Sequence, residues 1–136
     1  MTFDISFDRS VAYDPGLPGI SMTVELKLGS VVVQAPAKID TVSSHCIFTR
    51  YVAQELGIEV ETGQPLLVST VTGNFLTFGH TLTLATEGFE FDSTIYFMSE
   101  EGIGRNILGR LGWLDRMVIG INDYYGILYL KQHESE

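Results

Sequence analysis

Short runs in which apolar and polar residues alternate, separated by turns rich in glycine and proline, constrain the fold of this chain most strongly. Residues 2–8 alternate strictly, and residues 21–28 and 89–98 repeat the pattern. A period of two places successive side chains on opposite faces of an extended chain, which is typical of a half-buried β-strand. The sequence therefore predicts a mostly β protein.

Two pairs of apolar runs predict β-hairpins. Gly29-Ser30 joins the strand at 21–28 to the run that begins at Val31. Residues 66–78 hold two β-rich runs around Thr72-Gly73-Asn74. Glycine and asparagine suit such turns because they tolerate a positive φ angle.

One helix is expected at 50–56, with Thr49 as its N-cap and Gly57 ending it in the left-handed conformation. Trp113 is expected to pack in the core or at an interface. The C-terminal third predicts a short helical turn at 111–115 and strands at 117–121 and 125–130, with a turn at 122–123 between the strands.

Charge and cysteine content exclude several classes of function. Eight basic and 17 acidic residues give a net charge of −9, which repels nucleic acid and anionic membranes. The one cysteine, Cys46, cannot form a disulfide within the chain, and His45, His80 and His133 lack the spacing of metal ligands. We expect no metal or cofactor, and a cytoplasmic protein, because the first residues do not resemble a signal peptide.

An acidic residue stands where an apolar strand is expected to end. Asp40 follows Ile39, and Thr41, Ser43 and Ser44 supply three small hydroxyl groups within the next four positions. Hydroxyl and N–H groups there could orient the carboxylate while the strand end exposes it to a cleft. The alternative is an ordinary turn closed by the aspartate side chain, which the stretch taken in isolation favours.

The surroundings of Asp40 are similar to the aspartic peptidases of the retropepsin-like, single-lobed type, over roughly residues 20–130. In that family two apolar residues lead into Asp-Thr/Ser-Gly. The other matching segments are the hairpin at 22–38, Cys46-Ile47-Phe48 and the following helix, a hairpin at 69–75 in place of the flap, and Asn106-Ile107-Leu108-Gly109-Arg110. The resemblance implies an all-β, closed-barrel-like fold with one main α-helix. It sets boundaries of 1–19 for an N-terminal strand and connector, 20–131 for the retropepsin-like domain and 132–136 for a charged tail.

The resemblance also implies a homodimeric aspartic endopeptidase without cofactors, acting on peptide or protein substrates. Because Asp92 lies mid-strand on a polar face, only Asp40 is expected to be catalytic, one from each subunit. Thr41 would brace the two loops across the dimer axis, and Ser43 would support the carboxylate. The flap would consist of Val71, Thr72, Gly73, Asn74 and Phe75. The loop behind the site would consist of Ile107, Leu108, Gly109 and Arg110. The apolar walls of the substrate-binding site would be Ile47, Val71, Phe75 and Ile107.

Two positions depart from the family pattern. Val42 stands where the family has glycine, whose backbone N–H approaches the carboxylate in a crowded loop. Its isopropyl group either points into an open cleft and is tolerated, or it impairs catalysis. Ser44 stands where retroviral members usually carry an acid that pairs with the arginine after Ile-Leu-Gly, so Arg110 requires another partner.

Three functions remain open on the sequence. The first is an aspartic endopeptidase that prefers acidic pH, because a carboxylate pair shares one proton. The second is an inactive retropepsin-like module that binds peptides or dimerises, disabled by Val42. The third is an unrelated β-barrel binding module in which Asp40 is only a turn residue. A cysteine peptidase using Cys46 and His45 is disfavoured, since neighbours on a strand point to opposite faces.

Overall fold

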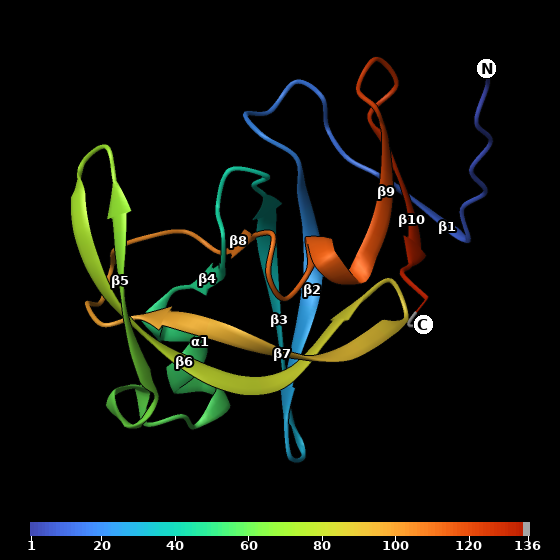
Figure 1. Ribbon diagram of the computed structural model, residues 1–136. Helices are drawn as coiled ribbons and strands as arrows, with labels where there is room; N and C mark the ends of the chain where they lie inside the picture. The colour runs from blue at the N-terminus through green and yellow to red at the C-terminus, as the bar shows by residue number, and fades with distance from the viewer. Residues whose placement is uncertain (135–136) are drawn as a thin grey trace.

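The computed structural model describes residues 1–134, and this part of the chain forms ten β-strands, one α-helix and two short 3-10 helices (Figure 1). The strands are β1 (Arg9–Ala12), β2 (Ser21–Leu28), β3 (Val31–Ile39), β4 (Cys46–Phe48), β5 (Gln64–Thr70), β6 (Gly73–Thr86), β7 (Phe89–Met98), β8 (Ile107–Leu108), β9 (Met117–Asn122) and β10 (Ile127–Gln132). The helices are α1 (Arg50–Leu56), η1 (Val60–Thr62) and η2 (Leu114–Arg116).

Six of the strands close into a barrel. They pair in the order β2-β3-β8-β4-β7-β6, and β6 returns to β2. β5 pairs with the first half of β6 and forms a hairpin that stands apart at one side of the barrel (Figure 1). The expected all-β, closed-barrel architecture with one main α-helix is therefore confirmed.

The alternation read from the sequence fills the barrel. In β7 the side chains of Phe91, Ser93, Ile95 and Phe97 are buried, and those between them are more exposed. Trp113 is fully buried in the core, and its Nε1 lies 3.4 Å from Thr86 Oγ1 as a donor. The period-two pattern thus identified correctly which face of this strand is apolar.

Helix α1 covers one side of the barrel and packs against β3 and β7. Val52, Ala53 and Leu56 form its buried face. Gly57 ends the helix with a φ of 77°, as expected, and its N–H donates to the Gln54 carbonyl at 3.1 Å. Thr49 precedes the helix, but its side chain makes no capping bond.

A second, three-stranded sheet has the order β1-β10-β9. The prediction of a strand at 2–8 is wrong, because the N-terminal strand begins at Arg9, opposite Leu130. Continuing this register would place Phe7 opposite Gln132, the last residue of β10, so within residues 1–134 no strand lies opposite the residues before Phe7. Phe3 and Ile5 are accordingly exposed.

Three C-terminal boundaries also differ from the expectation. β10 begins at Ile127, so the turn after β9 spans 123–126 rather than 122–123. The helical turn lies at 114–116, because Leu111 forms a β-bridge with His45 and Gly112 has a φ of 103°. Of the expected charged tail, Gln132 belongs to β10, and residues 135–136 lie outside the described part. Within residues 1–134, no helix is long and apolar enough to cross a bilayer.

Candidate active site

Asp40 lies directly after β3, at the point where this strand meets β8. The two strands run parallel, with Lys38 opposite Ile107 and Ile39 opposite Leu108. The Asp40 N–H continues this ladder by donating to the Leu108 carbonyl at 3.0 Å. The barrel therefore fixes the backbone of Asp40 and leaves its half-buried side chain at the strand end.

Two backbone amides hold the Asp40 carboxylate. Oδ1 accepts the N–H of Val42 at 2.9 Å and the N–H of Ser43 at 3.2 Å. This is the bonding of an aspartate turn, which was the simpler interpretation of the sequence. The same carboxylate also borders a cavity, so the turn presents an oriented carboxylate to open space.

Val42 fits the tight loop without a glycine. In residues 1–134 Glu87 is the one non-glycine residue with a positive φ, so the Val42 backbone lies in a region that L-residues readily adopt. Its side chain is 88% exposed and borders the same cavity as Asp40. The isopropyl group therefore points into open space and does not crowd the amides that hold the carboxylate.

The two hydroxyl residues beside Val42 lie differently from each other. Thr41 is exposed in the single chain. Ser43 contacts the carboxylate through its backbone N–H, whereas its hydroxyl donates to the His45 carbonyl at 2.7 Å. The expected support from Ser43 thus comes from its backbone, and its side chain closes the loop on itself.

Gly109 allows the segment behind the site to pass close to this loop. A Cβ at Gly109 would lie 2.2 Å from the His45 carbonyl oxygen and 2.8 Å from that of Ser43. The next two amides, of Arg110 and Leu111, donate to the Ser43 and Ser44 carbonyls at 2.9 Å each. Backbone contacts at this distance exclude any side chain at Gly109.

Asn106 anchors the same segment from its other end. Its Oδ1 accepts the Thr49 N–H at 3.1 Å, and its Nδ2 donates to the Pro36 carbonyl at 3.0 Å. One side chain thus ties β3 to the start of α1. The sequence placed Asn106 in the matching motif without indicating this role.

A groove of about 790 Å³ lies between the Asp40 loop and the β5–β6 hairpin. Of the residues expected at the site, six border it: Asp40, Val42, Ser43, Ile47, Val71 and Ile107. The expected site residues that do not are Thr41, Thr72, Gly73, Asn74, Phe75, Leu108, Gly109 and Arg110. The structure thus brings the aspartate together with three of the four expected walls, and Phe75 is absent from the lining.

Most of the residues that form the groove wall were not predicted from the sequence. Strand β5 lines it with Leu66, Leu67, Val68, Ser69 and Thr70, and the loop adds Ser44 and His45. The available signal was Leu66-Leu67-Val68, a run that does not alternate, so one of its apolar side chains must face outward. Leu67 is 60% exposed.

The tip of the hairpin is a short turn at Val71-Thr72, between β5 and β6. The Thr70 hydroxyl donates to the Gly73 carbonyl at 3.0 Å, which closes the turn. Val71 is fully exposed, and the tip stands clear of the barrel (Figure 1). The position suits a segment that folds over a ligand in the groove.

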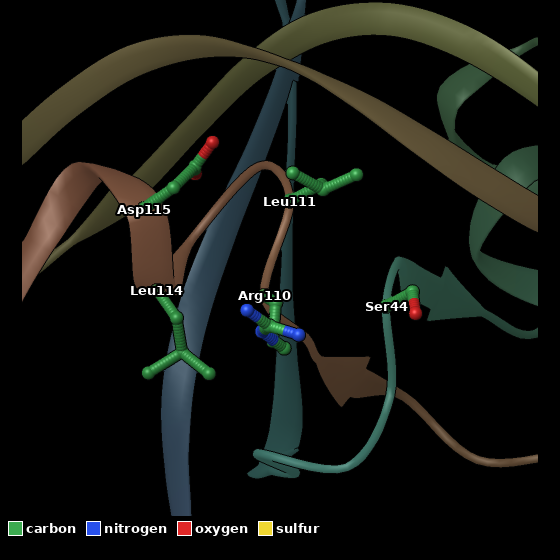
Figure 2. Close-up of a pocket in the computed structure, with 5 residues that line it drawn as sticks. All are labelled: Ser44, Arg110, Leu111, Leu114 and Asp115. Atoms are coloured by element: carbon green, nitrogen blue, oxygen red, sulfur yellow. The ribbon is translucent and has the colours of Figure 1, made fainter.

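A second cavity, of about 350 Å³, is lined by Ser44, Arg110, Leu111, Leu114 and Asp115 (Figure 2). Ser44 also lines the groove, so the two hollows share this residue. In Figure 2 Arg110 lies between Ser44 and Leu114. Within residues 1–134 the Arg110 side chain makes no ion pair and no hydrogen bond.

The residues considered as a cysteine nucleophile, its base or metal ligands have environments typical of structural residues. Cys46 is fully buried, and burial raises the pKa of its thiol to about 11, which disfavours the nucleophilic thiolate. The His45 ring packs against Tyr96, with 4.9 Å between centroids. Within residues 1–134 the His, Cys, Asp and Glu side chains form no group of three that could hold a metal ion.

Comparisons with known proteins agree with this geometry. No family model and no curated protein matches the sequence. The chain is similar in structure to a retropepsin-like aspartic protease from Rickettsia conorii, with a TM-score of 0.64 and 19% identity over 95% of this chain and 96% of that one. It is also similar to the EIAV protease complexed with the inhibitor HBY-793, with a TM-score of 0.57 and 19% identity over 74% of this chain and 88% of that one. The barrel, the flanking hairpin and the loop after β3 are together those of a chain with the retropepsin-like fold.

Proposed function

We propose that this protein is an aspartic endopeptidase whose active site is built by two copies of the chain. The observation that carries the proposal is the Asp40 carboxylate, oriented by the Val42 and Ser43 amides at the edge of a groove walled by apolar residues. The groove is open to solvent, so an extended peptide can enter it. Its β5 side offers strand backbone and apolar side chains to such a ligand.

The need for a second copy follows from the chemistry. Asp40 is the one carboxylate among the residues that line the groove. Peptide hydrolysis by carboxylates uses one group as a base and another as an acid. Two aspartates brought close together share a proton and supply both roles. A homodimer that joins two Asp40 loops provides this pair.

The proposed reaction proceeds through a water held between the two carboxylates. The ionised Asp40 accepts a proton from this water as its oxygen bonds to the scissile carbonyl carbon. The protonated Asp40 donates a hydrogen bond to the carbonyl oxygen. When the C–N bond breaks, the amine nitrogen takes up a proton from the pair, and one ionised and one protonated carboxylate remain.

Cleavage of a mixed peptide library between pH 4 and 7 tests the proposal. We expect turnover by the unaltered protein and a loss of at least about a thousandfold in Asp40→Asn, because removing one group of a catalytic pair abolishes its chemistry. Asp92→Asn is the matched control, since Asp92 is exposed on β7 outside the groove. Equal turnover by the Asp40 and Asp92 variants would contradict the proposal.

The exposed side chain of Val42 favours one competing function, a peptide-binding module without turnover. This side chain projects into the groove beside Asp40, where it could displace the catalytic water. Val42→Gly separates the two functions. Turnover only in the glycine variant would identify a sound scaffold with a disabled site, and equal turnover in both would show that the valine is tolerated.

A further inference from the structure

We propose that the second cavity, which adjoins the groove at Ser44, binds an acidic side chain of the peptide, with Arg110 as the group that recognises it. This inference rests on the proposed function and adds a substrate preference to it. It starts from the distribution of charge in the structure.

Of the lysines and arginines that form no ion pair within residues 1–134, Arg110 is the one that lines either hollow. Lys27 pairs with Glu90, and Arg50 pairs with Glu61. Within residues 1–134 Arg110 lies within ion-pair distance of no carboxylate, although the chain carries a net charge of −9. An exposed guanidinium beside a cavity is therefore left for a partner outside the chain.

The carboxylate that shares this cavity with Arg110 is already engaged. Asp115 Oδ1 accepts the Gly112 N–H at 2.9 Å and lies 3.9 Å from Arg116 Nε. The guanidinium of Arg116 also lies over the Phe91 ring, 5.6 Å from its centroid. The second cavity is therefore lined by a carboxylate that already has partners and by a guanidinium that has no ion-pair partner within residues 1–134.

The cavity is placed to receive a side chain of a peptide that lies in the groove. Ser44 lines both hollows, four residues beyond Asp40 along the chain. Leu111 and Leu114 supply apolar walls, against which the methylene groups of a glutamate can pack. Arg110, which lines the same cavity (Figure 2), supplies guanidinium N–H donors for its carboxylate. The chemistry therefore fits Glu or Asp within a few residues of the scissile bond.

Matched peptide pairs that differ only by Glu or Gln at one position test the inference at pH 6. We expect one position at which the unaltered protein prefers Glu by about two- to fivefold in kcat/KM, the range of a partly exposed ion pair. Arg110→Met should bring this ratio close to one, and Arg110→Glu should invert it. Arg105→Met is the control and should keep the wild-type ratio, because Arg105 is exposed and lines neither hollow.

Binding of the same peptides to Asp40→Asn, with and without Arg110→Met, separates this inference from the proposed function. If the unaltered protein cleaves peptides but its preference for Glu is absent or does not change in Arg110→Met, the inference is overturned and the proposed peptidase function stands. An Arg110-dependent Glu preference in binding, without any cleavage by the unaltered protein, supports the inference and contradicts the peptidase. Neither cleavage nor peptide binding overturns both.

Discussion

At the scale of single residues, the site depends on which backbone atoms come close together. Val42 brings its N–H to 2.9 Å from the Asp40 carboxylate while its side chain stays outside the loop. At Gly109 there is no space for a side chain, because a Cβ there would lie against the carbonyls of Ser43 and His45. A side chain is therefore accommodated at residue 42 and excluded at residue 109.

Gly109→Ala tests this contrast. The added methyl would lie 2.2 Å from the His45 carbonyl oxygen, which accepts the Ser43 hydroxyl, so the loop must shift, and we expect a loss of about 3 kcal/mol in the free energy of unfolding. Urea unfolding measures it. Gly16→Ala is the control, because its methyl would meet only the Asp14 side chain, at 3.2 Å. Equal stabilities of the two variants would show that the loop yields at no cost.

At the scale of elements, α1 is tied to η1 by an ion pair. Arg50 Nη1 and Nη2 donate to Glu61 Oε2 and Oε1 at 2.9 and 2.5 Å, and Nη1 also donates to the Ser99 carbonyl at 2.8 Å. Hydrogen bonding and the charge of Arg50 lower the pKa of Glu61. A carboxyl whose folded pKa is lowered stabilises the protein above its unfolded pKa, and this contribution is lost as the pH falls through the folded value.

Glu61→Gln should therefore lower the melting temperature at pH 7, and the gap from the unaltered protein should close below about pH 4 as Glu61 is protonated. Thermal unfolding followed by circular dichroism at both pH values measures this. Glu59→Gln removes the same charge from an exposed neighbour without a side-chain partner in residues 1–134 and serves as the control. A gap that persists at pH 3 would indicate another cause of the destabilisation.

The β5–β6 hairpin is the element that forms the apolar wall of the groove. Leu67 is 60% exposed and borders the groove, so Leu67→Ser should leave the melting temperature nearly unchanged. The variant should lose about tenfold in peptide affinity, the effect of removing one buried leucine contact. Titration calorimetry with Asp40→Asn as background measures it. Leu28→Ser, at the distant tip of the β2–β3 hairpin, is the matched control, and equal affinities would exclude β5 from the peptide site.

At the scale of the whole molecule, assembly is the property on which the proposed function depends. Each chain carries one groove with one aspartate and a net charge of −9. Two such chains repel each other through water, and salt screens this repulsion. Dimer formation should therefore respond to both protein concentration and ionic strength.

Sedimentation equilibrium should show a monomer–dimer exchange whose dissociation constant falls as salt rises from about 0.05 to 0.5 M, because the Debye length shortens. Activity per chain should rise with protein concentration over the same range. A monomer at every concentration, with constant activity per chain, would contradict the two-chain active site.

Local patterns identified the buried faces of strands that pair within the described chain, although they placed some strand ends wrongly. The alternation in β2 and β7 identified their buried faces, and the pattern around Asp40 placed the strand end and the loop. The same alternation was wrong at residues 2–8, because β10 ends at Gln132 and no strand of the described residues lies beside Phe3 and Ile5. Alternation with a period of two predicts which face of a strand is apolar. It does not predict whether another strand lies beside it to form the hydrogen bonds of a sheet.

The sequence by itself determined the strand character, the single helix with its end at Gly57, and the position of Asp40 at the end of a strand. Only the tertiary structure decided which residues line the groove, that Phe75 is not among them, and that Arg110 shares a cavity with Ser44 and has no ion-pair partner within residues 1–134. The physical reason is the distance along the chain between the residues that interact. Side-chain alternation and turn geometry depend on neighbours along the chain, whereas the groove and its charges arise where β5, β8 and the Asp40 loop meet in space.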